Sequence, residues 1–368
     1  VTLSSNVKTL PSKLFINCTV LDTVTLYGTE NGAPVVDLSL ITGYGSLSSK
    51  RTSFVLGNST FKNCTAIKEV ILNTSALNVL ANSLFDGCTN LTYVNKVKTG
   101  GTEEAPEYTS YLPDKLAYLG TYSFRNTSIE RVRMPDSLTS LGNSISNASG
   151  TDATKMWKTG KDGDEYKCNY ESLSGAFDGC TKLTYLDLNN VIRIGMLAFR
   201  NCPLTEVAGT EGEEGKIAGA LDLSKVQVFG IGAFAGTGLK SVDLSGVWLN
   251  KDKYSKTQAK FPMGFGNGDQ NSTTLITTTD KEGVFENCKQ LKEVKFSATT
   301  SGTWDDKSTS ASISLGALMF KNCSNLQSVY LPKSVGNLPK SVFYGCTRLE
   351  NVSFETVTDK SGKEIENN

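Results

Sequence analysis

The chain has 368 residues, in which 37 lysines and arginines balance 37 aspartates and glutamates, and it contains no histidine. The balanced charge does not favour nucleic acid or an acidic membrane surface as a partner. Without histidine, neither a Ser-His-Asp triad nor a Cys-His pair can be assembled. No apolar run approaches the roughly 18 residues of a membrane-spanning helix.

The predicted elements follow one pattern, Phe-x-x-Cys-x-x-Leu-x-x-Val-x-Leu, which recurs along the whole chain. The closest anchor phenylalanines are 22 to 24 residues apart, as from Phe177 to Phe199 and from Phe61 to Phe85. A repeat of this length is typical of a solenoid, whose copies bury their apolar faces against each other. In chain order the ten anchors are Phe15, Phe61, Phe85, Phe124, Phe177, Phe199, Phe234, Phe285, Phe320 and Phe343.

Each copy contains two extended stretches and one turn. The Leu-x-x-Val-x-Leu part alternates apolar and polar positions, which indicates a strand with one buried face, and successive strands should form one parallel sheet. A second apolar stretch precedes the anchor, for example Leu116–Phe124, where Gly120 permits a tight corner. The Phe-x-x-Cys segment is expected to form a short helical or 3₁₀ turn.

Cysteine stands three residues after the anchor in eight copies, and threonine, at Thr127 and Thr237, in two. A zinc site needs paired ligands such as Cys-x-x-Cys, a pattern that does not occur here. Cysteines one coil apart would point in parallel at about 4.8 Å, whereas a disulfide needs convergent Cβ atoms about 3.8 Å apart. We therefore predict that the eight are buried free thiols that fill a packing position, while Cys168, in an insertion, is a weak candidate for a functional thiol. The eight are Cys18, Cys64, Cys88, Cys180, Cys202, Cys288, Cys323 and Cys346.

Long insertions separate some copies, and they should project from one side of the coil between the strand and the next Phe turn. Some are expected to form hairpins. They are rich in Gly, Ser, Thr, Lys and Asp and include Ser46–Thr52, Thr99–Glu107, Gly150–Glu165, Lys251–Thr279 and Thr299–Ser310.

Other patterns give little support for catalysis, a cofactor or a metal. The acidic run Asp162–Glu165 lacks a full calcium loop, and Gly264–Gly268 lacks the Gly-Lys-Ser/Thr ending of a phosphate loop. Asn-x-Ser/Thr triplets begin at Asn17, Asn63 and Asn322, where local hydrogen bonding in a tight turn explains the asparagine better than glycosylation does.

The repeat closely resembles the BspA-like class of leucine-rich repeats of bacterial surface proteins. Leu331-Pro332 leads to Phe343 and Cys346 as in that class, Met134-Pro135 repeats the opening, and Gly232-Ala233-Phe234 repeats the middle. The resemblance implies an α+β solenoid, a right-handed leucine-rich repeat superhelix with a parallel concave sheet, about ten copies and several long loop insertions. We predict a single domain over 1–368, with recognisable copies at about 3–354 and a polar tail at 355–368.

The resemblance also implies an extracellular or cell-surface protein, in many members lipid-anchored through an N-terminal segment, that adheres to host matrix or bacterial surface proteins. No catalytic, cofactor or metal residue is expected. The alternatives are a glycan-binding module that uses the inserted loops, and a structural surface spacer.

Residues that flank the central apolar position of each strand should point outward on the concave sheet. Tyrosine and arginine are enriched at interface hot spots, although tyrosine also favours strands in any exposed sheet. The candidate binding residues are Tyr93, Asn95, Arg131, Arg133, Tyr185, Asp187, Glu293, Lys295 and Tyr330.

Overall fold

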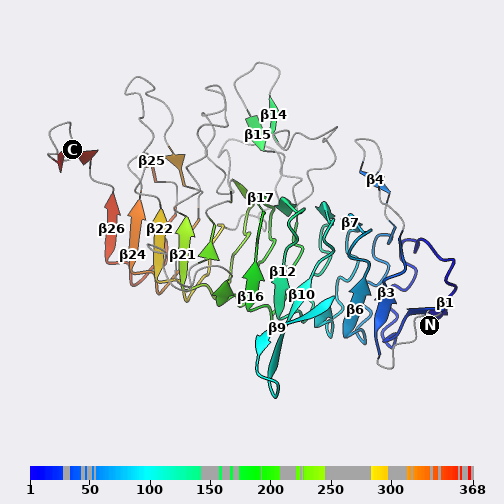
Figure 1. Cartoon of the computed structure of the whole chain (residues 1–368). Coiled ribbons are helices and arrows are strands. Elements are labelled where there is room, and N and C mark those ends of the chain that lie inside the picture. The colour runs from blue at the N-terminus through cyan, green and yellow to red at the C-terminus, as the bar shows by residue number, and fades with distance from the viewer. Residues whose placement is uncertain are drawn as a thin grey trace. The chain divides into compact units, whose positions relative to one another are not determined.

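The computed structural model of the chain forms two compact units, Val1–Ala208 and Gly209–Asn368, and each is described by itself (Figure 1). It describes residues 1–27, 34–42, 46–47, 52–53, 55–141, 157–159, 166–168, 174–191, 193–207, 221–223, 226, 228–244, 283–296, 313–315, 318–331, 335–338, 341–354, 357–358 and 364–365.

The first unit carries a row of parallel strands, one from each coil of chain, as the alternating pattern predicts. In β6, Val70 and Leu72 are buried whereas Glu69 and Ile71 are half-buried. The register stays constant between coils: Val36 pairs with Val70, which pairs with Val94. The strands of this row are β1 (Thr2–Leu3), β2 (Thr25–Leu26), β3 (Val36–Leu38), β6 (Glu69–Leu72), β8 (Tyr93–Val94), β10 (Pro106–Tyr111), β12 (Arg131–Arg133), β16 (Tyr185–Asp187) and β18 (Glu206–Val207).

A second row of two-residue strands lies between the first row and the Phe turns. These strands correspond to the predicted second apolar stretch; Tyr118 and Leu119, for example, pair in parallel with Val79 and Leu80. They are β7 (Val79–Leu80), β11 (Tyr118–Leu119), β13 (Ser140–Leu141) and β17 (Arg193–Ile194).

The second unit has the same layout. Ser241, Glu293, Ser328 and Asn351 occupy one register row of its five-stranded sheet. Its strands are β19 (Leu221–Asp222), β20 (Val228–Phe229), β21 (Ser241–Leu244), β22 (Glu293–Phe296), β23 (Ile313–Ser314), β24 (Ser328–Leu331), β25 (Val335–Asn337) and β26 (Asn351–Phe354), and the tail holds the antiparallel pair β27 (Val357–Thr358) and β28 (Glu364–Ile365).

The anchor phenylalanines stack on one another and form the spine of each unit. From Phe15 to Phe199, consecutive rings lie 5.4 to 5.7 Å apart at their centroids, with interplanar angles of 9° to 24°. The rings from Phe234 to Phe343 stack in the same way. Such pairs contribute about 0.5–1.5 kcal/mol beyond the burial of their area, so the stack couples each coil to its neighbours.

The residue after the anchor adds a ladder of alternating charge. Asp86, whose side chain is 2% exposed, accepts Lys62 Nζ at 3.0 Å and an Arg125 guanidinium nitrogen at 2.8 Å. Asp178 and Arg200 form the next pair at 2.8 Å. Opposite charges on adjacent coils satisfy carboxylates that would be costly to bury alone.

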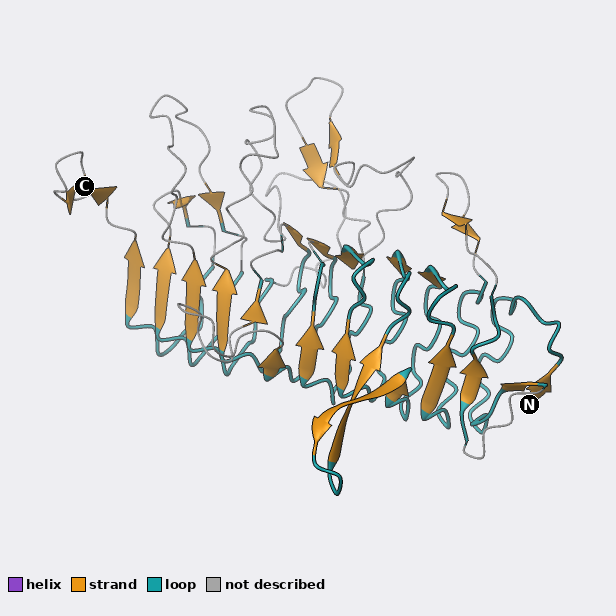
Figure 2. Cartoon of the chain, viewed as in Figure 1, coloured by secondary structure: helices purple, strands orange, loops and turns teal. Residues whose placement is uncertain are grey.

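Among the described residues there are strands, turns and loops but no helix (Figure 2), so the helical part of the predicted α+β class is not found there. The reason lies in the Phe turns. Around Phe61, both Ser59 (φ 58°) and Asn63 (φ 59°) adopt the left-handed backbone conformation, which interrupts the run of right-handed residues that a helix needs. The right-handed winding and the count of about ten copies stay predictions, as does the single domain.

The insertions that contain described residues form antiparallel strand pairs. These are β4 (Ser46–Leu47) with β5 (Thr52–Ser53), β9 (Lys96–Gly101) with β10, and β14 (Trp157–Thr159) with β15 (Tyr166–Cys168). Most of Gly150–Glu165 and all of Lys251–Thr279 and Thr299–Ser310 lie outside the described residues.

Thr99–Glu107 corrects the prediction that insertions follow the strand. The β9–β10 hairpin interrupts the strand of its own coil, because β8 pairs with β6 on one side and β10 resumes the sheet against β12 on the other. The hairpin therefore projects from the strand row itself (Figure 1).

Candidate functional site

The structure brings four of the predicted binding residues together on β12 and β16 of the first unit. Arg131 pairs in register with Tyr185, and Arg133 with Asp187. All four alternate with the buried Val132 and Leu186, so their side chains lie on the outward side of the sheet. In the second unit, Glu293 pairs in register with Ser328, and Lys295 with Tyr330.

Arg131 and Tyr185 form the centre of this group. The Arg131 guanidinium lies 4.1 Å from the centroid of the Tyr185 ring, and a Glu107 carboxylate oxygen lies 3.8 Å from an Arg131 nitrogen. Burial, and then the charge of Asp187, raises the pKa of Tyr185. Its hydroxyl therefore stays protonated and can donate a hydrogen bond at neutral pH.

Arg133 forms a second stacked pair, with a residue that sequence reasoning missed. Its guanidinium lies 5.5 Å from the centroid of the Tyr111 ring, and its Nε donates to Asp187 at 3.1 Å. These contacts hold the side chain in one position before any ligand arrives.

The β9–β10 hairpin contributes a third cluster. Lys96 Nζ lies 4.6 Å from the ring centroid of Tyr93 and 4.2 Å from that of Tyr108. The two rings meet edge to face with centroids 5.9 Å apart. Burial, and then the charge of Glu130, raises the pKa of Tyr93. The cluster places two aromatic rings and an ammonium group at the base of the hairpin.

These three clusters together are the aromatic-cationic face. It consists of Tyr93, Lys96, Tyr108, Tyr111, Arg131, Arg133 and Tyr185.

Sequence reasoning missed Lys96, Glu107, Tyr108 and Tyr111 because it took Tyr93 and Asn95 as the outward residues of this coil and assigned Thr99–Glu107 to an insertion. One signal could have found Tyr111. Leu112-Pro113 repeats the strand ending of Met134-Pro135, which shows that the coil's strand resumes just before it.

The Asn95 side chain forms hydrogen bonds with the backbone of two strands, whereas we predicted that it would contact a ligand. Its Oδ1 accepts the Leu72 amide at 2.7 Å, and its Nδ2 donates to the Tyr111 carbonyl at 3.0 Å. The side chain thus bridges β6 and β10 where the hairpin interrupts the sheet. Because both ends of the amide already bind backbone, we do not assign Asn95 to the ligand-binding residues.

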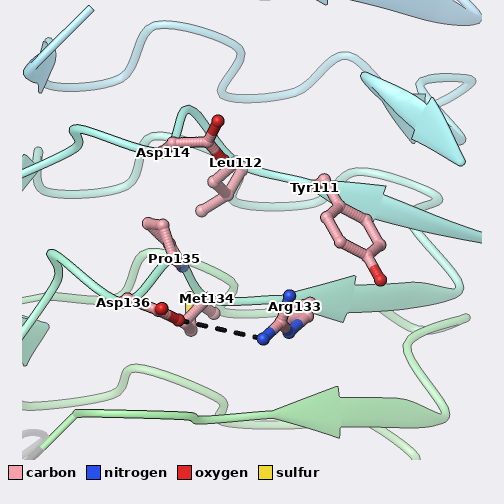
Figure 3. Close-up of a pocket in the computed structure, with 7 residues that line it drawn as sticks. All are labelled: Tyr111, Leu112, Asp114, Arg133, Met134, Pro135 and Asp136. Carbon is pink, nitrogen blue, oxygen red and sulfur yellow. Dashed lines mark ion pairs between the residues drawn. The ribbon is translucent and has the colours of Figure 1, made fainter. Parts of the chain in front are cut away.

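A shallow pocket of about 170 Å³ lies where β10 and β12 end (Figure 3). Leu112, Met134 and Pro135 are buried beneath it, and Tyr111 and Arg133 join it to the aromatic-cationic face. Asp114 and Asp136 complete the lining. The pocket can hold one small group, such as the end of a long side chain.

Six of the eight ladder cysteines are buried free thiols as predicted, whereas Cys18 is exposed and Cys346 is half-buried. Cys64 Sγ donates to the Phe15 carbonyl at 2.9 Å and Cys88 Sγ to the Phe61 carbonyl at 3.0 Å, one coil back in each case. Burial raises the pKa of Cys64 to about 11, so the thiol is a poor nucleophile at neutral pH. The side chain of Cys168 lies outside the described residues.

The asparagines of the Asn-x-Ser/Thr triplets also have structural partners. Asn63 Nδ2 donates to Asn17 Oδ1 at 2.9 Å, and Asn322 Nδ2 to Asn287 Oδ1 at 3.0 Å. The partner is the asparagine of the neighbouring coil rather than the local backbone that we expected.

The described residues contain no group of three or more Cys, Asp or Glu side chains placed to hold a metal ion. No helix among them is long and apolar enough to cross a membrane.

A family model, BspA type leucine rich repeat region, matches the chain in six copies over residues 1–103, 44–151, 168–214 and 277–367. No curated protein sequence matches it.

Three solved structures illustrate the likeness to known proteins. A leucine rich cell surface protein from Faecalibacterium prausnitzii is 18% identical, with 98% of this chain and 80% of that chain covered and a TM-score of 0.38. A leucine-rich repeat protein from Bacteroides ovatus is 17% identical, with 86% and 78% covered and a TM-score of 0.34. The pneumococcal vaccine antigen PcpA is 17% identical, with 97% and 79% covered and a TM-score of 0.33.

Proposed function

Because this chain belongs to the BspA-type leucine-rich repeat family, we propose that it is a non-catalytic interaction protein that binds a protein ligand through the aromatic-cationic face. Membership in the family rests on the six matched copies. The location of the ligand site rests on the side-chain geometry of the first unit.

The pairing of Arg131 with Tyr185 at 4.1 Å is the observation that carries the proposal. Binding costs side-chain entropy when flexible groups become ordered at an interface. In the free protein each of the two arginines of the face already has an aromatic and an acidic neighbour. Part of the cost of ordering these side chains is therefore met before binding. Tyrosine and arginine are also the side chains most enriched among hot spots.

We also propose that the ligand is a host matrix or bacterial surface protein, and that the chain acts as an adhesin at a bacterial cell surface. This part of the proposal follows from the family resemblance. The stacked coils are compatible with this role. Each coil packs only against its neighbours, which leaves the outer face of the sheet available to a ligand.

The test compares two double variants of the purified chain in binding to an immobilised panel of host matrix proteins. Arg131→Ala/Tyr185→Ala removes the central pair and should weaken binding to the captured protein by about 2 kcal/mol or more, roughly 30-fold. The matched control, Arg348→Ala/Tyr344→Ala, removes an exposed arginine and tyrosine from the last Phe turn and should leave the affinity unchanged.

The result is decisive in both directions. Equal affinity of the two double variants for a captured protein would remove the aromatic-cationic face as the site. A specific glycan on an array, bound without any matrix protein, would favour the glycan-binding alternative. Absence of any ligand would favour the structural spacer.

A further inference from the structure

The pocket beside the aromatic-cationic face is lined by two aspartates from adjacent coils. Tyr111 pairs in register with Arg133, so Asp114 and Asp136, three residues further on, occupy equivalent positions of adjacent coils. Both lie in the same kind of turn, closed by the Leu116 amide to the Pro113 carbonyl at 2.9 Å and by the Leu138 amide to the Pro135 carbonyl at 3.1 Å. Figure 3 shows the two carboxylates at the same end of the pocket.

The two coils therefore carry like charges at equivalent positions, an arrangement that is unfavourable without a counter-charge. The equivalent position in the following coil is the neutral Asn190, whose Nδ2 donates to the Asp136 carbonyl at 3.1 Å. In the preceding coil the Thr74 carbonyl accepts the Asp114 amide at 3.0 Å. The paired negative charge is thus confined to the pocket.

Side chains of the molecule only partly neutralise this charge. Arg133 Nε is already bound to Asp187 at 3.1 Å, and its nearest nitrogen is 3.8 Å from Asp136. Asn189 Nδ2 also donates to Asp136. Within the part of the chain that the structure describes, no cation lies within ion-pair distance of the Asp114 carboxylate. Three carboxylates against one guanidinium leave the site net negative, which disfavours an anion.

We propose that the pocket receives a lysine or arginine side chain of the protein ligand, an inference that rests on the function proposed above. The aliphatic part of such a side chain would lie on Leu112 and Pro135, as long basic side chains do on apolar surface. Its cationic end would lie between the Asp114 and Asp136 carboxylates, and the Tyr111 ring forms the remaining wall. A metal ion is a poorer occupant, because two carboxylates and an apolar floor fall short of its ligand number.

The experiment needs no identified partner, because Met134 forms part of the pocket and its methyl group reports on occupancy. The chain is labelled with ¹³C-methyl methionine, Met134 is assigned by the loss of its signal in Met134→Leu, and N-acetyl-argininamide is added in the millimolar range. N-acetyl-citrullinamide, a neutral molecule of nearly the same shape, is the matched ligand. Asp114→Asn, Asp136→Asn and the exposed control Asp22→Asn are titrated in parallel.

We expect a saturable shift of the Met134 signal with the arginine compound and none with citrulline. Each pocket substitution should lower the affinity by roughly threefold, and Asp22→Asn should leave it unchanged. No shift with arginine or lysine amides, an equal shift with citrulline, or a shift caused by Ca²⁺ alone would overturn the proposal. Failure here would leave the Arg131/Tyr185 test intact, and failure of that test would leave the pocket titration intact.

Discussion

Single residues that accept a left-handed backbone determine the shape of the Phe turns. The residue two after the anchor is either asparagine or glycine. At Gly87, Gly179 and Gly345, glycine stands where the asparagine of the preceding coil needs room. Gly87 has a φ of +75°, and a Cβ built on it would lie 2.1 Å from Asn63 Oδ1. Gly345 meets Asn322 in the same way, at 2.4 Å. This position therefore couples backbone conformation to the contact between coils.

Gly87→Ala should lower the free energy of unfolding by roughly 1–3 kcal/mol. Alanine is strained at a positive φ, and its Cβ would displace the Asn63 side chain. Urea denaturation followed by circular dichroism measures the change. Gly100→Ala is the control: its Cβ would meet only the flexible Glu107 carboxylate, at 3.2 Å. Similar losses for the two variants would contradict the explanation.

The buried thiols predict a pH dependence of stability. Burial raises the pKa of Cys64 from 9.0 to about 11, so between these values the unfolded chain loses the thiol proton while the folded chain keeps it. The stabilisation is complete below about pH 9 and is lost as the pH rises towards 11. Urea midpoints should therefore fall over this range.

Cys64→Thr provides the comparison for that prediction, since threonine occupies the same position at Thr127 and Thr237. Threonine does not titrate, so the variant should lose less stability than the parent between pH 8 and pH 10. Identical slopes for the two proteins would show that Cys64 does not contribute.

At the scale of elements, the β9–β10 hairpin determines where side chains gather. It interrupts one strand of the row, and Ser110 Oγ receives the Val94 amide at 3.2 Å to join the two halves. The hairpin brings Lys96 and Tyr108 to Tyr93 and Glu107 to Arg131. Three of the seven residues of the aromatic-cationic face, Lys96, Tyr108 and Tyr111, therefore lie on this hairpin.

Asn95→Ala should lower the free energy of unfolding by about 2 kcal/mol or more. The substitution leaves the Leu72 amide and the Tyr111 carbonyl without their side-chain partner, and alanine also disfavours the φ of 44° at this position. Asn95→Asp keeps the acceptor for Leu72 and should lose about half as much. Thermal unfolding of the three proteins tests this order, and a neutral Asn95→Ala would disprove the bridging role.

At the scale of the whole molecule, the coils within each unit are stabilised by the coils next to them. In such a chain, stability is close to a sum of coil and interface terms. The first and last described turns lack one neighbour, and their thiols show it: Cys18 is exposed and Cys346 half-buried, whereas Cys64 and Cys323 are buried.

Hydrogen exchange followed by mass spectrometry should therefore find fast exchange around Phe15 and Phe343 and slow exchange from Phe61 to Phe199. The control lies within the same experiment, because all these turns share one set of hydrogen bonds, such as the Cys64 amide to the Phe61 carbonyl at 3.1 Å. Uniform exchange along the chain would mean that the coils open together instead.

The sequence by itself determined the repeat, the parallel strand row and the buried ladders of Phe and Cys. These follow from periodic burial, which is a local property: a two-residue alternation and a fixed Phe-to-Cys spacing place the same side chains inside in every coil. The outward positions of Arg131, Arg133, Tyr185 and Asp187 followed from the same alternation.

Only the tertiary structure decided which outward residues meet. We predicted that Tyr93 and Asn95 would both contact a ligand. In the structure Tyr93 packs with Lys96 and Tyr108, whereas the Asn95 side chain is hydrogen-bonded to backbone. The pocket that Asp114 and Asp136 line was likewise not predicted. Both depend on the register between coils and on where an irregular hairpin enters the strand, and periodicity along one chain carries no information about either.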